Sequence, residues 1–168
     1  MKFIVSSTGL FSRLQAISRV INSKNSLPIL DCFLVELNEN GLSITASDSE
    51  TTLTTSMEAN EVNGFGRFAV SSKTILDALK EIPEQPITFE VNMDTWEIQV
   101  RYLNGKFNLM GRNADEYPET PALRDEAVSL SIAANVLATG INRSIFATAD
   151  DEFHPVLNGI FLDITIEV

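Results

Sequence analysis

The chain has 168 residues, a formal net charge of −11 and a hydrophobic content of 44%. This length supplies one ordinary hydrophobic core, and the negative charge excludes a wholly basic nucleic-acid-binding protein. No apolar run approaches the roughly 18 residues of a membrane span, and the apolar N-terminal stretch is too short for a signal peptide, so we expect a cytoplasmic protein without membrane contact.

The first half of the chain begins with a short apolar strand at residues 2–5. A helix is predicted next, because apolar residues recur at intervals of four, three and four. Ser7 or Thr8 can cap this helix. This stripe consists of Leu10, Leu14, Ile17 and Ile21. A loop at residues 22–26 ends at a proline, and strands are predicted at 29–37, 42–46 and 51–59, the first two joined by an Asn-Gly turn.

The second half repeats this order. A strand is predicted at residues 65–70, and Ser71 or Ser72 caps a second helix that ends at Pro83. Three further strands follow at 87–91, 96–102 and 106–110. Two helices on an antiparallel sheet are the simplest fold for this order, which predicts the α+β class.

The start of the chain reappears near its end at an offset of 127 residues. Leu10 and Leu14 align with Leu137 and Ile141, and the proline of the first loop aligns with Pro155. Such self-similarity is typical of duplicated domains. The sequence therefore predicts a complete domain at residues 1–124 and the truncated start of a second at 125–168.

Basic residues are concentrated where acidic residues are absent. Residues 1–30 carry four basic side chains and no acid, so they hold +4 and the remainder −11 − 4 = −15. Lys73 and Lys80 lie two turns apart on one side of the second helix. Asp77 and Glu81 reduce the net positive charge of this helix. This pattern indicates a local surface for a polyanion, although four basic residues in thirty also occur as ordinary solubilising groups.

Several motifs together resemble a known family, the bacterial DNA polymerase III beta subunits, or sliding clamps. They are Met1-Lys2-Phe3, Leu27-Pro28-Ile29-Leu30, Ser47-Asp48, residues 71–79, Tyr117-Pro118 and Leu157-Asn158-Gly159. The resemblance implies the DNA-clamp fold, with two helices packed on antiparallel sheet in each domain. It also implies a processivity factor without catalytic residues or cofactors, in which two three-domain chains close into a ring around double-stranded DNA. The ring slides without sequence specificity and tethers the replicative polymerase after a clamp loader has placed it.

The same resemblance implies positions for DNA contact. Lys24 and Lys73 match basic DNA-contacting positions of the family. Residues on the helices that face the hole contribute long-range charge; they are Arg13, Arg19, Lys80 and Arg143. A further DNA-contacting loop of the family has a polar residue and two aromatic residues where this chain has Asp151, Pro155 and Val156, so that contact is expected to be weak. In this loop only His154 could add positive charge, once it is protonated.

Two protein interfaces are also implied. The family joins two chains through an edge strand matched here by Lys106, Phe107 and Leu109, although Phe107 and Leu109 alternate as an ordinary inward strand face would. Of the pocket that receives polymerase and clamp-loader peptides, the chain holds Leu157. The apolar faces of residues 128–168 lack the rest of their domain, and we expect them to pair with another chain in a non-native oligomer.

Two other function classes are considered. An enzyme could use Asp48 with Glu50, or the acidic cluster at residues 150–152, but such clusters in acidic proteins are mostly solvated turns. The single histidine and the single cysteine, Cys32, assemble neither a zinc site nor a Cys-His pair, and we expect no metal. A non-catalytic acidic protein-interaction module is the alternative, although it leaves the offset repeat unexplained.

Overall fold

The computed structural model describes residues 1–21, 27–119, 130–149 and 153–163. The chain divides into two compact units, Met1–Pro121 and Ala122–Val168, and each is described by itself. Lys24, Asp151 and the predicted domain boundary at residues 124 and 125 lie outside the described residues.

The first unit confirms the predicted α+β class, because two helices accompany strands that are all antiparallel. Its first half contains β1 (Lys2–Ser6), α1 (Ser7–Ile17), β2 (Cys32–Asn38), β3 (Gly41–Ser47), β4 (Thr52–Met57) and β5 (Asn60–Asn63). Its second half contains β6 (Gly66–Ser71), α2 (Ser72–Lys80), β7 (Pro86–Val91), β8 (Glu97–Tyr102) and β9 (Gly105–Asn113). Short 3-10 turns lie at η1 (Ser18–Val20), η2 (Pro28–Asp31) and η3 (Ala114–Glu116).

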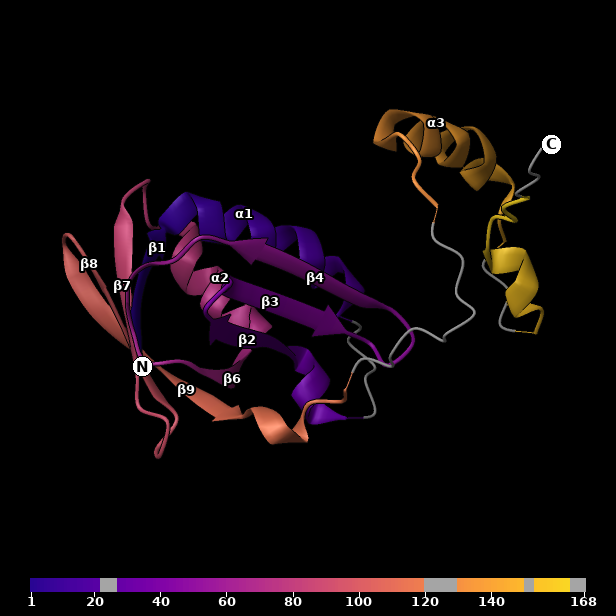
Figure 1. The fold of residues 1–168 in the computed structure, drawn as a ribbon. Helices are drawn as coiled ribbons and strands as arrows, with labels where there is room; N and C mark the ends of the chain where they lie inside the picture. Colours follow the sequence, from indigo (N-terminus) through magenta and orange to yellow (C-terminus); the bar gives the residue numbers. More distant parts are fainter. Residues whose placement is uncertain (22–26, 120–129, 150–152, 164–168) are drawn as a thin grey trace. The chain divides into compact units, whose positions relative to one another are not determined.

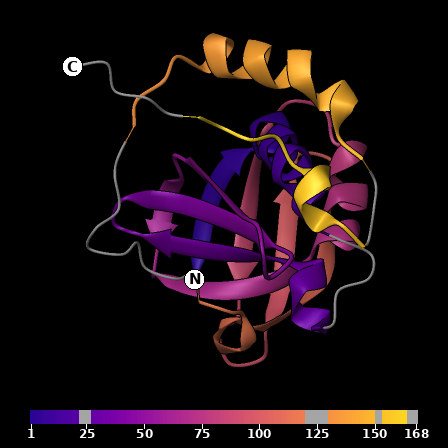
Figure 2. The same cartoon turned by 90° about the vertical axis from the view of Figure 1, so that its right-hand side faces the viewer.

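The strands form one sheet in the order β4-β3-β2-β6-β9-β8-β7-β1-β5. The two halves of the unit interlock, since β1 pairs with β7 and β6 pairs with β2. Helices α1 and α2 pack against each other and on the sheet, and Figures 1 and 2 show the strands curving around them. The sheet therefore has a helix-covered inner face and an outer face.

The core fills the space between the helices and the inner face of the sheet. Alternate residues of β1, β7 and β8 are buried there, as the period of two requires, among them Phe3 of β1 and Phe89 of β7. The rings of these two residues stack with centroids 5.0 Å apart. Burying each such side chain contributes about 1.5–3 kcal/mol, so the core accounts for most of the stabilisation of this unit.

The start of α1 differs from the prediction by one residue. Its N-cap is Ser6, whose hydroxyl accepts a hydrogen bond from the backbone N–H of Gly9 at 2.9 Å. Ser7 is instead fully buried, donates to the carbonyl of Pro83 at 2.7 Å and accepts from the N–H of Gln85 at 3.0 Å. A serine that is needed for packing between distant segments cannot also cap the helix. The predicted cap of α2 by Ser71 is confirmed.

Two strand predictions need correction. Residues 29–31 belong to the 3-10 turn η2, and β2 begins at Cys32. Pro28 suits the first position of such a turn because its φ is preset and it has no N–H to satisfy. Strand β5 was not predicted, because all four of its residues are exposed and it shows no apolar alternation.

The second unit repeats the helical elements of the first. Helix α3 (Ala134–Ser144) and the turns η4 (Ile145–Ala147) and η5 (Pro155–Asn158) each lie 127 residues after α1, η1 and η2. The described residues 130–133 and 159–163, which align with β1 and β2, form no strand. A helix satisfies its own backbone hydrogen bonds, whereas a strand forms only beside a partner strand.

Candidate nucleic-acid interface

Helix α2 carries the two basic side chains predicted for its outer side. Lys73 lies in its first turn and Lys80 is its last residue, and both are exposed. The buried side of the helix is formed by Ile75 and Leu79. Seven residues at 3.6 per turn bring the lysines to one side, opposite the buried pair. Exposed Asp77 lies between them and reduces the positive charge.

The basic residues of the α1 region differ from each other. Arg19, in η1, is exposed. Arg13 is half-buried, and its guanidinium donates from Nε to the carbonyl of Ser56 at 3.1 Å and from one terminal nitrogen to the carbonyl of Gly9 at 3.0 Å. The bond to Ser56 attaches α1 to β4, and the bond to Gly9 stays within α1.

The predicted residues of the second unit lie on α3 and η5. Arg143 is exposed in the last turn of α3. His154 and Val156 are exposed, Pro155 begins η5, and Leu157 is also exposed.

No helix among the described residues is long and apolar enough to cross a membrane.

The predicted interface residues lie on β9, which is open along part of its length. Phe107 and Leu109 pack half-buried against the core, while Lys106 is exposed. Strand β9 pairs with β8 from residue 105 to 110 but with β6 only at residues 111–113. Among the described residues, the stretch 105–110 therefore has a neighbour on one side only.

Hydrogen bonding defines which groups this open edge presents. The N–H of Gly111 donates to the carbonyl of Trp96, on the β8 side, at 2.8 Å. Because the direction of hydrogen bonding alternates along an antiparallel strand, the backbone groups of Lys106, Asn108 and Met110 point away from β8. These groups are suited to pairing with a further strand.

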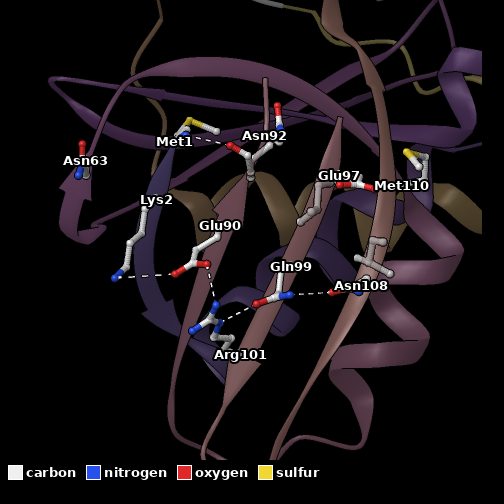
Figure 3. A pocket seen from close by; sticks show the side chains of 13 residues that line it. Met1, Lys2, Asn63, Glu90, Asn92, Glu97, Gln99, Arg101, Asn108 and Met110 are labelled. Carbon is white, nitrogen blue, oxygen red and sulfur yellow. Dashed lines mark hydrogen bonds and ion pairs between the residues drawn. The ribbon is translucent and has the colours of Figure 1, made fainter. Parts of the chain in front are cut away.

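The outer sheet face holds an open polar groove that sequence reasoning missed (Figure 3). It has a volume of about 870 Å³ and is crossed by a row of residues in register from β5 to β9. The row consists of Asn63, Lys2, Glu90, Gln99 and Asn108. The polar alternation of residues 97, 99 and 101 was the available signal.

The charges in this groove are largely compensated. Arg101 donates to the Glu90 carboxylate at 3.1 Å and to the side-chain oxygen of Gln99 at 2.7 Å. Lys2 lies 4.0 Å from the same carboxylate. The groove is therefore a hydrogen-bonded polar surface, with no concentration of a single charge.

The carboxylates considered for an enzyme have a structural role where they are described. One Asp48 oxygen accepts hydrogen bonds from the N–H groups of Glu50 and Thr51, at 3.0 and 2.7 Å, and closes the turn between β3 and β4. No group of three or more His, Cys, Asp or Glu residues in the described part of the chain is arranged to hold a metal ion. The acidic cluster 150–152 lies outside that part.

Burial raises the pKa of the Cys32 thiol, partly offset by Arg112. Burial also raises the pKa of Tyr117 to about 12. A hydrogen bond from Arg67 holds the pKa of the Asp115 carboxyl below its usual range.

Comparison with known proteins agrees with this geometry. A family described as DNA polymerase III beta subunit, N-terminal domain, matches residues 1–121. The beta sliding clamp of Halalkalibacterium halodurans is 27% identical over 171 residues, covering 98% of this chain and 44% of the relative. That of Vibrio cholerae is 29% identical over 164 residues, with the same coverage of 98% and 44%. The chain thus spans less than half the length of these relatives.

Solved structures show the same fold. The DNA polymerase III subunit beta from Pseudomonas aeruginosa superposes with a TM-score of 0.84 at 26% identity, covering 95% of this chain and 43% of that one. The sliding clamp from Bacillus subtilis gives a TM-score of 0.82 at 24% identity, covering 93% and 42%.

Proposed function

Because the chain belongs to the family of DNA polymerase III beta subunits, which are non-catalytic accessory subunits, we propose that it acts in a ring that encircles duplex DNA. In this proposal the ring is a processivity factor of bacterial DNA replication and works in the cytoplasm. The observation that carries the proposal is helix α2, which presents Lys73 and Lys80 on the side opposite its buried stripe.

A ring holds DNA by enclosure, so its contacts with phosphate need only be weak and indifferent to sequence. We assign such contacts to Lys24 and Lys73. The long-range positive charge comes from Arg13, Arg19, Lys80 and Arg143. Contact through Asp151, Pro155 and Val156 is weak in this proposal, because this loop has lost the family's polar and aromatic residues.

Protein contacts use other surfaces. The open edge of β9, with Lys106, Phe107 and Leu109, is the proposed contact with a partner chain in a homodimeric ring. Its outward backbone groups provide hydrogen bonds for an added strand. Leu157 is assigned to the pocket for peptides of the replicative polymerase and the clamp loader. Residues 1–124 form the first domain and residues 125–168 the start of the second.

The test is binding to a labelled primed duplex between about 20 and 200 mM salt, where phosphate contacts weaken steeply. The variant Lys24→Glu/Lys73→Glu is compared with Lys2→Glu/Arg112→Glu, which makes the same charge change on strands β1 and β9. We expect weak binding that fades with salt, is lost in the first variant and persists in the second.

Equal losses in both variants would show that net charge alone matters and would overturn the assignment to the helical side. Binding that is unaffected by the first variant would place the DNA contact elsewhere. Absence of DNA binding at every salt concentration, together with capture of a protein partner, would favour the acidic protein-interaction module.

A further inference from the structure

Arg13 is held in place by two backbone carbonyls from different elements. Its Nε donates to Ser56 of β4 at 3.1 Å, and a terminal nitrogen donates to Gly9, one turn earlier in α1, at 3.0 Å. The side chain is half-buried, and α1 packs directly on β4. Figure 1 shows the helix lying alongside this strand. Arg19, Lys73 and Lys80 are all exposed.

The carbonyl of Ser56 belongs to an open edge. In the described part of the chain β4 pairs only with β3. The hydroxyls of Thr45 and Thr54 lie 2.9 Å apart, which is typical of the closely spaced pairs that exchange no backbone hydrogen bonds. Ser56 is two residues beyond Thr54 and opposes Ser43 in the same kind of pair. The Ser56 carbonyl therefore points away from β3, and it accepts the hydrogen bond from Arg13.

We infer that Arg13 fastens α1 to the open edge of β4 and caps the Ser56 carbonyl, and that it is not a fixed phosphate contact. A planar guanidinium donates in two fixed directions, which a lysine ammonium on its flexible stem does not reproduce. An edge carbonyl that is already bonded is also unavailable to a foreign strand. The statement about phosphate rests on the proposed function, whereas the fastening role does not.

The experiment compares Arg13→Lys and Arg13→Gln with Arg19→Lys and Arg19→Gln in the whole chain. Thermal unfolding and amide hydrogen exchange measure the fastening role without DNA. We expect both Arg13 variants to lower Tm by about 2–5 °C and to accelerate exchange in α1 and β4. Both Arg19 variants should leave Tm and exchange unchanged, because Arg19 is exposed and its side chain makes no hydrogen bond to another element in the described part of the chain.

The salt dependence of DNA binding tests the second claim, that Arg13 is not a fixed phosphate contact. Arg13→Gln, which removes the charge, should change the slope of log K against log salt by clearly less than one, despite the lower Tm. Unchanged Tm and exchange in both Arg13 variants would overturn the fastening role. A slope reduced by about one in Arg13→Gln would overturn the exclusion of a phosphate contact. If the chain binds no DNA, the proposed function fails, but Tm and exchange still decide the role of Arg13.

Discussion

The backbone N–H of Gly111 donates to the carbonyl of Trp96 at 2.8 Å, at the point where β9 passes from β8 to β6. A Cβ on Gly111 would lie 3.1 Å from the carbonyl oxygens of both Ala69 and Trp96 and from Ile98 Cδ1. Trp96 itself has a φ of +61°, a backbone conformation that residues other than glycine rarely adopt. The two parts of the sheet are thus joined through a site without room for a side chain.

Gly111→Ala is therefore expected to destabilise the first unit by about 1–3 kcal/mol, the usual cost of overpacking. Urea unfolding monitored by Trp96 fluorescence measures this. Gly140→Ala on α3 is the control, because nothing lies within 4 Å of its added Cβ. Equal stability of Gly111→Ala and the parent chain would mean that the backbone moves freely at this junction.

Ser7→Ala should remove about 1–3 kcal/mol of stability, because the buried Ser7 hydroxyl is lost and the part-buried carbonyl of Pro83 and N–H of Gln85 are left without their side-chain partner. Ser12→Ala is the matched control on the same helix. Its hydroxyl is exposed and donates only to the carbonyl of Gly9 at 3.1 Å. Chemical denaturation of both variants makes the comparison, and similar midpoints would contradict a role for Ser7 in joining α1 to the segment before β7.

The buried hydroxyl of Tyr117 should make the protein less stable in alkali. This hydroxyl is buried, and burial raises its pKa to about 12, although the backbone of Ser47 partly offsets the rise. Since the pKa in the unfolded chain is near 10, the folded state loses stability as pH rises from about 10 to 12.

Tyr117→Phe should remove this part of the alkaline loss and leave stability at pH 7 unchanged or higher. Unfolding free energies of both proteins from pH 7 to 12 provide the measurement. Parallel curves for the two proteins would show that Tyr117 ionises as easily in the folded state as in the unfolded one.

Acid should weaken the contact between β6 and η3. Arg67 lies 2.6 Å from the Asp115 carboxylate, and this hydrogen bond lowers the pKa of Asp115. A lowered pKa gives stability that is present above the unfolded value, about 4, and is lost as pH falls through the folded value. The stability difference between the parent chain and Asp115→Asn should therefore shrink towards pH 2. A difference that stays constant with pH would exclude this ion pair as its source.

Asp77→Asn should strengthen DNA binding about twofold to fivefold at low salt, because it removes the negative charge between Lys73 and Lys80. The gain should fade as salt increases. Asp94→Asn makes the same charge change in the exposed turn between β7 and β8. Fluorescence anisotropy with a labelled duplex compares the two variants, and an equal gain in both would indicate an effect of net charge alone.

The local pattern of the chain predicted its helices better than its strands. The apolar stripe that includes Leu10 and Leu14 located α1, and the offset of 127 residues located α3, because a helix depends mainly on residues three and four positions away. Strand β5 carries no such signal, since only its pairing with β1 defines it. The candidate site divides in the same way: the spacing of Lys73 and Lys80 placed them on one side of α2, whereas nothing near Arg13 in the sequence indicates Ser56.

The sequence by itself determined the α+β class, the hairpin turns, the helical faces and the family of this chain, because periodicity, turn residues and motif spacing are local properties. Only the tertiary structure decided which strand edges stay open, that Arg13 is bonded to β4, and that Ser7 is buried while Ser6 caps the helix. Each of these features joins segments far apart in the chain, such as Ser7 and Gln85. Such contacts arise from the pairing and packing of the whole sheet, which no local pattern records.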